Sequence, residues 1–288
     1  PGEWAVINGG HQQALPVIYY HSGSQTYCPI RWVFRNFEVT GGGTANGTCF
    51  GGGISLWTAA YVTFMYLYIH DNYGGGSEND AGIVIRNDAQ AAQFITIKYC
   101  YLKNNCDPNN HNCANISFFS DYVSTPTAVT NINSTRHKNE IAYNLLEGSC
   151  MGIKSKAEQY LSLDNTGNHT TYKEYGDKIH HNIIRYHQDE GISARQDFIQ
   201  VYNNIIESST SHIGIALGSS HYDTEREPFY ACAYNNWYVE STQPNTTSVK
   251  TYPNVHLDIN NMDGAPLSNS RTIRSTFAGA GPRVGHRP

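Results

Sequence analysis

Short segments that alternate apolar and polar residues recur along most of the chain. One type starts with Gly, or once with Asn, followed by Ile and an alternating stretch, as in "GIVIRN" from residue 82. Alternation over four to six residues predicts β-strands with one face toward a core. Segments of this type begin at Gly53, Gly82, Asn115, Gly152, Gly191 and Gly214.

A second type of segment falls between these. Alternating apolar residues lead to an Asn and then to two or three further apolar residues, as in "HHNIIR" around Asn182. The two types alternate strictly, and the Gly-led segments begin 23 to 39 residues apart. The equivalent positions of the second type are Asn36, Leu67, Cys100, Asn144, Asn182, Asn204 and Asn236.

Repeated strands without an amphipathic helical stretch between them predict an all-β solenoid, a single-stranded parallel β-helix whose repeats pair strand on strand. The irregular period is explained by polar turn insertions, at 103–114, 121–138 and 164–177. The recurrent Asn predicts a ladder of side-chain amides, which Leu67 and Cys100 interrupt. An antiparallel sandwich would need hairpin signals every 8–12 residues, and the ordered alternation of the two segment types disfavours it.

The repeat divides the chain into three parts. We expect residues 1–29 to form an N-terminal cap or an incomplete first coil, and residues 30–242 to form the β-helix. Residues 243–288 lack the repeat and are predicted to be a tail that packs on the β-helix or extends from it, since solenoids need covered ends. Because the first residue is Pro1, we expect a processed or truncated product.

The phrases "YIHDNYGG", "VYNNIIESS" and "GIALG" resemble those of secreted right-handed β-helix proteins. The resemblance covers roughly residues 16–242. It implies the right-handed form of the parallel β-helix, and this fold carries many different activities.

The period of two assigns side-chain directions within the Gly-led strands. In "GIKSK", Ile153 and Ser155 point inward, while Lys154 and Lys156 point outward. The residues four after each Gly then form one outer column, in which "NISFFS" contributes Phe119 or, if shifted by one, Ser120. The predicted column is Trp57, Arg86, Phe119, Lys156, Arg195 and Gly218.

Adjacent strands of a sheet lie about 4.8 Å apart, so this column would hold Lys156 and Arg195 side by side. Two neighbouring cations are unfavourable unless an anion lies over them. The column therefore predicts a site for an acidic ligand, with Trp57 and Phe119 as flat faces for sugar rings. The alternative is that these cations are ordinary solvated surface charges.

Composition narrows the function classes. The formal net charge of −5 disfavours a nucleic-acid partner, and no apolar run is long enough to span a bilayer. Of seven cysteines, Cys106 and Cys113 bracket the loop "CDPNNHNC" and predict a local disulfide rather than a zinc site. The cysteine content favours a secreted or cell-surface protein, and the odd number leaves at least one thiol unpaired or bonded to another chain.

The column is similar to the site of the alginate lyase and chondroitinase B family. There a Lys in a "KS" pair and an Arg on the next coil act as base and acid, and nearby acidic residues bind Ca²⁺. The resemblance implies Lys154 (in "KS") or Lys156 as the base, Arg195 as the acid and Glu147 as a Ca²⁺ ligand. The chain departs from the family pattern in reading "RQD" where the family has "RHG", and in lacking a second acid beside Glu147.

Two further clusters contain titratable residues in predicted turns. "RYHQDEG" places His187, Asp189 and Glu190 before the Arg195 strand, and "IHDNYG" places His70 and Asp71 at an equivalent turn. These residues are candidate acid/base or metal groups, although Asp, Asn and His are also common turn formers. The thirteen histidines include no metalloenzyme spacing such as HExxH.

Three functions follow. The first is an extracellular carbohydrate-active protein, most concretely a lyase that cleaves acidic polysaccharide by β-elimination, with Arg86, Trp57 and His187 binding substrate and Glu147, Asp189 and Glu190 as candidate Ca²⁺ ligands. The second is a structural or adhesive protein that assembles into homo-oligomers or filaments through the ends of its solenoid. The third is a sugar-binding module without catalysis.

Overall fold

The described part of the chain is built from parallel β-strands. The computed structural model describes residues 4–11, 15–21, 28–29, 31–43, 52–57, 59–73, 81–87, 94–106, 113–120, 138–157, 177–195, 199–208, 214–218, 232–240, 257–260 and 271–278. These residues contain strands and turns but no helix. Every pairing between described strands is parallel. The all-β prediction is confirmed, and an antiparallel sandwich is wrong for these strands.

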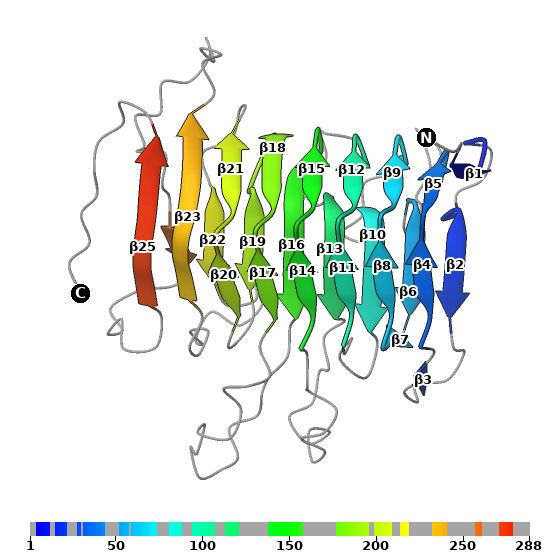
Figure 1. Ribbon diagram of the computed structural model, residues 1–288, viewed down its shortest axis with the longest axis horizontal. Helices are drawn as coiled ribbons and strands as arrows, with labels where there is room; N and C mark the ends of the chain where they lie inside the picture. Colours follow the sequence, from blue (N-terminus) through cyan, green and yellow to red (C-terminus); the bar gives the residue numbers. More distant parts are fainter. Residues whose placement is uncertain are drawn as a thin grey trace.

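The strands form two large sheets and one small one (Figure 1). The 15-stranded sheet contains β1 (Ala5–Asn8), β4 (Val33–Arg35), β5 (Phe37–Thr40), β8 (Thr63–Met65), β9 (Tyr68–His70), β11 (Thr96–Lys98), β12 (Tyr101–Lys103), β14 (Glu140–Ala142), β15 (Leu145–Glu147), β17 (Lys178–His180), β18 (Ile183–His187), β20 (Gln200–Tyr202), β21 (Ile205–Ser208), β23 (Cys232–Glu240) and β25 (Arg271–Ala278). The eight-stranded sheet contains β2 (Ile18–His21), β6 (Ile54–Trp57), β10 (Ala81–Asn87), β13 (Ala114–Ser120), β16 (Met151–Ala157), β19 (Ile192–Arg195), β22 (Ile215–Gly218) and β24 (Leu257–Asn260). The two-stranded sheet contains β3 (Cys28–Pro29) and β7 (Ala59–Ala60).

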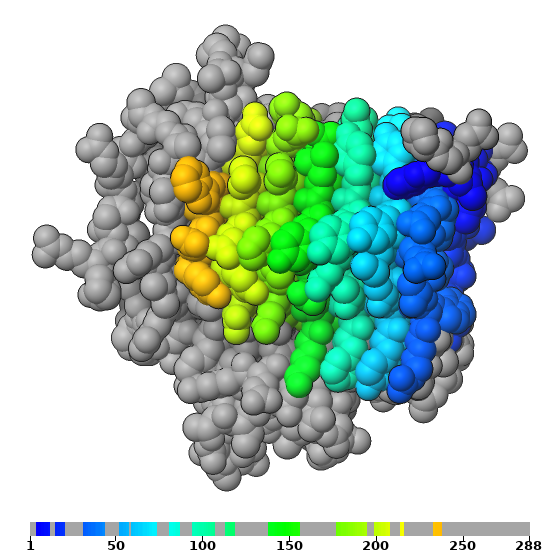
Figure 2. All heavy atoms as spheres, viewed as in Figure 1, coloured from blue at the N-terminus to red at the C-terminus, as the bar shows by residue number. Residues whose placement is uncertain are grey.

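From β6 to β21, each repeat passes through the sheets in the same order. A strand of the eight-stranded sheet, such as β6, is followed by two strands of the 15-stranded sheet, such as β8 and β9. The next repeat adds β10, β11 and β12 beside them, and Figure 2 shows the described repeats as bands in sequence order. This arrangement is consistent with a parallel β-helix.

The core consists of columns of like residues. The Ile that follows each Gly pairs in register with the Ile of the next repeat. Their side chains are buried in one cluster together with apolar residues of the 15-stranded sheet, so their predicted inward direction is confirmed. The column comprises Ile54, Ile83, Ile116, Ile153, Ile192 and Ile215.

The recurrent Gly is required by the close approach of consecutive repeats. A Cβ atom added at Gly152 would lie 2.5 Å from the carbonyl oxygen of Gly191 and 2.4 Å from Cγ2 of Ile184. A Cβ at Gly191 would lie 2.7 Å from the carbonyl oxygen of Gly214. Both positions therefore exclude any larger residue, which explains why the strands repeatedly begin with Gly.

The predicted Asn ladder is present. Nδ2 of Asn144 donates to Oδ1 of Asn182, Asn182 donates to Asn204, and Asn204 donates to Asn236, each at 3.0 Å. Cys100 interrupts the column of amides, although its backbone N–H donates to Oδ1 of Asn144.

The placement of Asn36 in this ladder is wrong. Arg35 pairs with Met65 and Glu38 with Tyr68, which leaves Phe37 opposite Leu67. Asn36 lies one residue earlier, at the turn position where φ is +61°, a left-handed conformation that Asn adopts readily.

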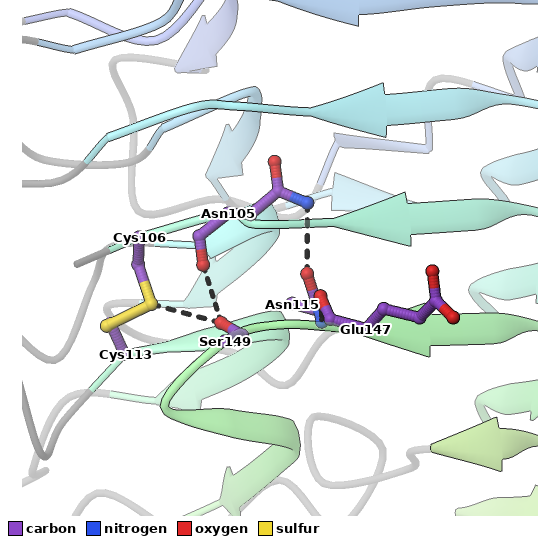
Figure 3. The surroundings of a disulfide bond; sticks show 6 residues. All are labelled: Asn105, Cys106, Cys113, Asn115, Glu147 and Ser149. Atoms are coloured by element: carbon purple, nitrogen blue, oxygen red, sulfur yellow. Dashed lines mark hydrogen bonds between the residues drawn. A yellow bond between two sulfur atoms is a disulfide. The ribbon is translucent and has the colours of Figure 1, made fainter. Parts of the chain in front are cut away.

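A second amide chain lies beside the disulfide (Figure 3). Nδ2 of Asn72 donates to Asn105, and Nδ2 of Asn105 donates to Oδ1 of Asn115, which replaces Gly at the start of its strand. The predicted Cys106–Cys113 disulfide is confirmed. Cys100 and Cys150 are both buried.

Strands also occur in the predicted cap and tail. In the cap, β1 pairs with β5 and β2 pairs with β6; in the tail, β24 pairs with β22 and β25 pairs with β23. These pairings extend both large sheets beyond residues 30–242, while the three-part division itself stays a prediction. The predicted insertions lie largely outside the described residues, which omit 107–112, 121–137 and 158–176.

Replacing Asn182 with Leu is expected to lower the free energy of unfolding by about 2–4 kcal/mol. The side chain accepts from the backbone N–H of Asn144 and donates to the carbonyl oxygen of Ile141, and both buried groups would lose their partner. Gln200→Leu, a matched change at a half-buried position, is expected to cost less than about 0.5 kcal/mol. Chemical denaturation measures both values, and equal losses would contradict a stabilising role for the ladder.

Candidate functional site

The outer column of the eight-stranded sheet has the predicted register. Trp57 pairs with Arg86, Arg86 with Phe119, Phe119 with Lys156, and Lys156 with Arg195. The shifted alternative with Ser120 in the column is therefore wrong. The side-chain positions of Phe119, Lys156 and Arg195 lie outside what the structure describes, so their juxtaposition is established for the backbone.

Trp57 and Arg86 are in direct contact at the start of this column. The Arg86 guanidinium lies 4.2 Å from the centre of the Trp57 ring, a cation–π contact between adjacent strands. The indole N–H of Trp57 donates to Oγ of Ser55, and Tyr19 packs edge-on against the ring. Both Trp57 and Arg86 remain partly exposed. The contact leaves a fixed cation at the surface.

Lys154 does not lie at the surface, and its predicted exposure is wrong. The side chain is fully buried, as are those of Val84 and Ser193, to which the same alternation assigns an outward direction. Lys154 pairs with Ser117 on one side and with Ser193 on the other. Alternation shows on which face of a strand a residue lies, but not whether that face meets solvent. At this column, both faces of the eight-stranded sheet are buried.

Glu147 lies in the other large sheet and is held by two neighbours. Its carboxylate accepts a hydrogen bond from the Tyr101 hydroxyl and another from Nε of Arg185. Burial, together with the hydrogen bond to Glu147, raises the pKa of Tyr101, and the same carboxylate raises the pKa of Arg185. These contacts give Glu147 a structural role in joining β12, β15 and β18.

The turn before β19 contains the other acidic candidates. Glu190 is buried and Asp189 is partly exposed. His187 is buried as well, and this burial lowers the pKa of its imidazole to about 4. The His187 ring therefore does not line the surface of the outer column. Among the described residues, no group of three or more His, Cys, Asp or Glu side chains has an arrangement that would hold a metal ion.

His70 belongs to a separate cluster on β9. Its Nε2 lies 3.0 Å from a carboxylate oxygen of Glu38, and its Nδ1 lies 2.7 Å from one of Asp71. The ring also stacks on Tyr68. Both carboxylates are thus occupied by the same ring, in the 15-stranded sheet and away from the outer column.

Two features of the 15-stranded sheet were missed in the sequence. The first is a row of stacked, exposed rings, in which Tyr66 stacks on Tyr99 and Tyr99 on Tyr143, each pair with centroids 5.3 Å apart. His181 stacks on Tyr143 at 4.9 Å. The signal was the Tyr that occurs one residue before the Leu67, Cys100 and Asn144 positions.

The second missed feature is an ionic cluster. Nζ of Lys98 lies 2.8 Å from Oε2 of Glu140, and Nε2 of His180 lies 3.0 Å from Oε1 of the same carboxylate. The adjacent histidines at 180–181 are visible in the sequence. However, only the register shows that Lys98 and His180 lie on either side of the strand that carries Glu140, each in line with Ala142.

No protein-family model, curated protein or solved structure matches this chain. Within the described segments, no helix is both long and apolar enough to cross a membrane. The disulfide is of the kind that persists in oxidising compartments. The outer column and the ionic cluster are therefore interpreted from their own geometry.

Below pH 6.5, His187 is expected to make the protein progressively less stable. At higher pH the ring is neutral whether the chain is folded or unfolded, so it does not affect how the free energy of unfolding depends on pH. Between about pH 6.5 and 4 the unfolded chain binds a proton that the folded chain excludes, because the folded pKa is about 4. The loss from this group alone is about 3 kcal/mol.

His187→Gln, which cannot titrate, is expected to flatten this part of the pH dependence of unfolding measured by denaturation. His11→Asn, a substitution at an exposed histidine, provides the control. A slope that is the same in His187→Gln and in the unaltered protein would show that His187 is not the group responsible.

Proposed function

We propose that the chain forms a right-handed parallel β-helix and acts outside the cell, where it binds acidic polysaccharide along the outer column of the eight-stranded sheet. The observation that carries this proposal is the register that sets Lys156 beside Arg195 in the column that starts with the Trp57–Arg86 contact. Cations on consecutive strands suit a polymer that carries a carboxylate on every sugar. The Cys106–Cys113 disulfide supports an extracellular location.

The most concrete activity is β-elimination. A base removes the C5 proton of a uronate, the bond from C4 to the leaving oxygen breaks as a C4–C5 double bond forms, and an acid protonates that oxygen. We assign Lys156 as the base and Arg195 as the acid. Lys154 is excluded from these roles because it is fully buried.

The remaining candidates have smaller parts in this proposal. Arg86 pairs with substrate carboxylates, whereas His187 is buried away from the column. The resemblance implies Ca²⁺, but the described Glu147, Asp189 and Glu190 do not form a cluster with the geometry of a metal site. No catalytic step is therefore routed through a metal, and Ca²⁺ enters only as a condition of the assay.

An assay of unsaturated uronate by ultraviolet absorbance tests the lyase activity on alginate, pectate, glucuronan and chondroitin, with and without calcium. Lys156→Gln is expected to abolish turnover while retaining the polymer in affinity electrophoresis, because it removes the base but only one of several cations. Lys178→Gln, at an exposed lysine of the other sheet, is the control and should change neither.

Arg86→Gln is expected to weaken retention about tenfold, the effect of one charge-assisted hydrogen bond. Absence of absorbance on all four polymers would disprove the lyase. If the polymers were also not retained, acidic polysaccharide would be the wrong ligand, whereas retention without turnover would identify a binding module.

A second candidate function, self-assembly, is favoured by the exposed strands at one end of the sheets. β1, β2 and β4 are end strands, so each has one edge without a described neighbour. Large apolar side chains are exposed on and beside them, with Val33 62% exposed. A second copy of the chain can cover such an edge. The exposed residues are Trp4, Val6, Ile7, Leu15, Tyr19, Trp32 and Val33.

Light scattering tests this second candidate. The unaltered protein is expected to show a mass that rises with concentration, and Val33→Lys should suppress the rise because a charge would be buried at the contact. Ile183→Lys, an equally polar change at an exposed residue in mid-sheet, should leave the rise unchanged. A monomer at every concentration would rule out assembly.

A further inference from the structure

The two adjacent histidines at the end of β17 direct their rings toward each other. In a regular strand, consecutive side chains point to opposite faces. His181, however, has a φ of +55°, at a turn where the backbone adopts the left-handed conformation. As a result, Nδ1 of His180 and Nδ1 of His181 are only 2.8 Å apart. Two imidazole nitrogens thus meet at one point of the 15-stranded sheet.

His180 is held rigidly by its surroundings. Its Nε2 donates to the Glu140 carboxylate at 3.0 Å, and the ring stacks on Tyr202 with centroids 4.7 Å apart. Lys98 binds the second oxygen of Glu140 and balances its charge. Because Nε2 carries the proton that Glu140 accepts, neutral His180 has its lone pair on Nδ1, facing His181.

This is the arrangement that proteins use to orient a metal ligand. A metal-binding His commonly donates its other ring N–H to a carboxylate, which fixes the ring and increases its basicity. His180 has this second contact, because its Nε2 lies 3.0 Å from the carboxylate of Glu140. Neutral imidazole is the form that coordinates metals.

His181 completes the pair from the solvent side. Its side chain is exposed and stacks on Tyr143, and its Nε2 lies 3.3 Å from Nδ2 of Asn203. Without a metal, one Nδ1 must carry a proton that the other accepts. A metal ion would replace that proton, and the exposure of His181 leaves room for water at the other coordination positions.

We propose that Nδ1 of His180 and Nδ1 of His181 form a binding site for Cu²⁺, with Glu140 and Lys98 as its supporting shell. Imidazole is a preferred ligand of copper, and Cu²⁺ binds nitrogen donors most tightly among the divalent first-row ions. Two protein ligands suffice for an open site in which water supplies the others. Ca²⁺ prefers oxygen ligands and is not expected to compete.

The neighbouring repeats provide variants that preserve the fold. Asn203 and Asn235 occupy the turn position of His181 with φ of +54° and +57°, so His181→Asn keeps the local backbone. Tyr202 pairs with His180, so His180→Tyr keeps the stacked column. His11→Asn is the matched control, because His11 also has a left-handed φ of +53° but lies near the N-terminus, far from His180 in the sequence.

The experiment is a titration of the metal-free full chain with CuCl₂, in which calorimetry and electron paramagnetic resonance detect binding. The unaltered protein and His11→Asn are expected to bind one tight equivalent with hyperfine coupling from two nitrogens. His181→Asn and His180→Tyr should each lose that equivalent, and Glu140→Gln should weaken it about 10- to 100-fold. Excess Ca²⁺ should have no effect.

A second measurement needs no variant. Copper is expected to protect His180 and His181 from diethyl pyrocarbonate, as read by peptide mass spectrometry, while His11 stays reactive. The proposal is overturned if both histidines react equally with and without copper, or if folded His181→Asn and His180→Tyr bind Cu²⁺ as the unaltered chain does. The proposed polysaccharide site lies on the other sheet, so neither result depends on it.

Discussion

In-register pairing of parallel strands from consecutive repeats is the constraint on which the rest of this structure depends. Because the strands pair at a separation of about 4.8 Å, each side chain lies directly above its equivalent in the next repeat. Where the repeats approach closely, as between Gly152 and Gly191, not even a Cβ atom fits. The pairing therefore decides which residue types each column accepts.

Because equivalent residues of consecutive repeats lie next to each other, each column needs a residue type that interacts favourably with a copy of itself. Ile packs on Ile, Asn bonds to Asn, and Tyr66 stacks on Tyr99, so identical residues satisfy one another. Charges cannot be treated in this way. In the ionic cluster the Glu140 carboxylate binds both Lys98 and His180, and the buried Lys154 has Ser on both sides. The Lys156–Arg195 pairing departs from this rule, and the proposed anionic ligand would balance its charge.

The sequence predicted the periodic features of the fold well. The order of the strands, the Ile column and the register from Trp57 to Arg195 follow from the Gly-led segments, because a column must align to form a core. Asn36 was assigned to the ladder, although it lies at the turn position one residue before it. The reason is that Asn suits both the ladder and the left-handed turn. Single segments do not distinguish these two positions, whereas pairing with Met65 and Tyr68 does.

The candidate site was harder to predict because it depends on burial and on contacts between strands of different repeats. Alternation assigned Lys154 to the outer face, but that face is buried at this column. Glu147 was treated as a ligand because of its distance from Lys154 in sequence, yet Tyr101 and Arg185, from other repeats, occupy its carboxylate. The His180–Glu140 contact joins residues 40 positions apart, which no local motif reveals.

Ring stacking limits how the exposed aromatic residues can bind a ligand. Tyr66, Tyr99 and Tyr143 turn their faces toward one another, so each presents mainly its edge. One face of Trp57 is covered by the Arg86 guanidinium. A sugar ring that packs on an aromatic residue needs a free face, and these rows of rings offer few. If the outer column binds a polymer as proposed, its cations would contribute more to recognition than stacking, which favours a polymer with regularly spaced carboxylates over a neutral one.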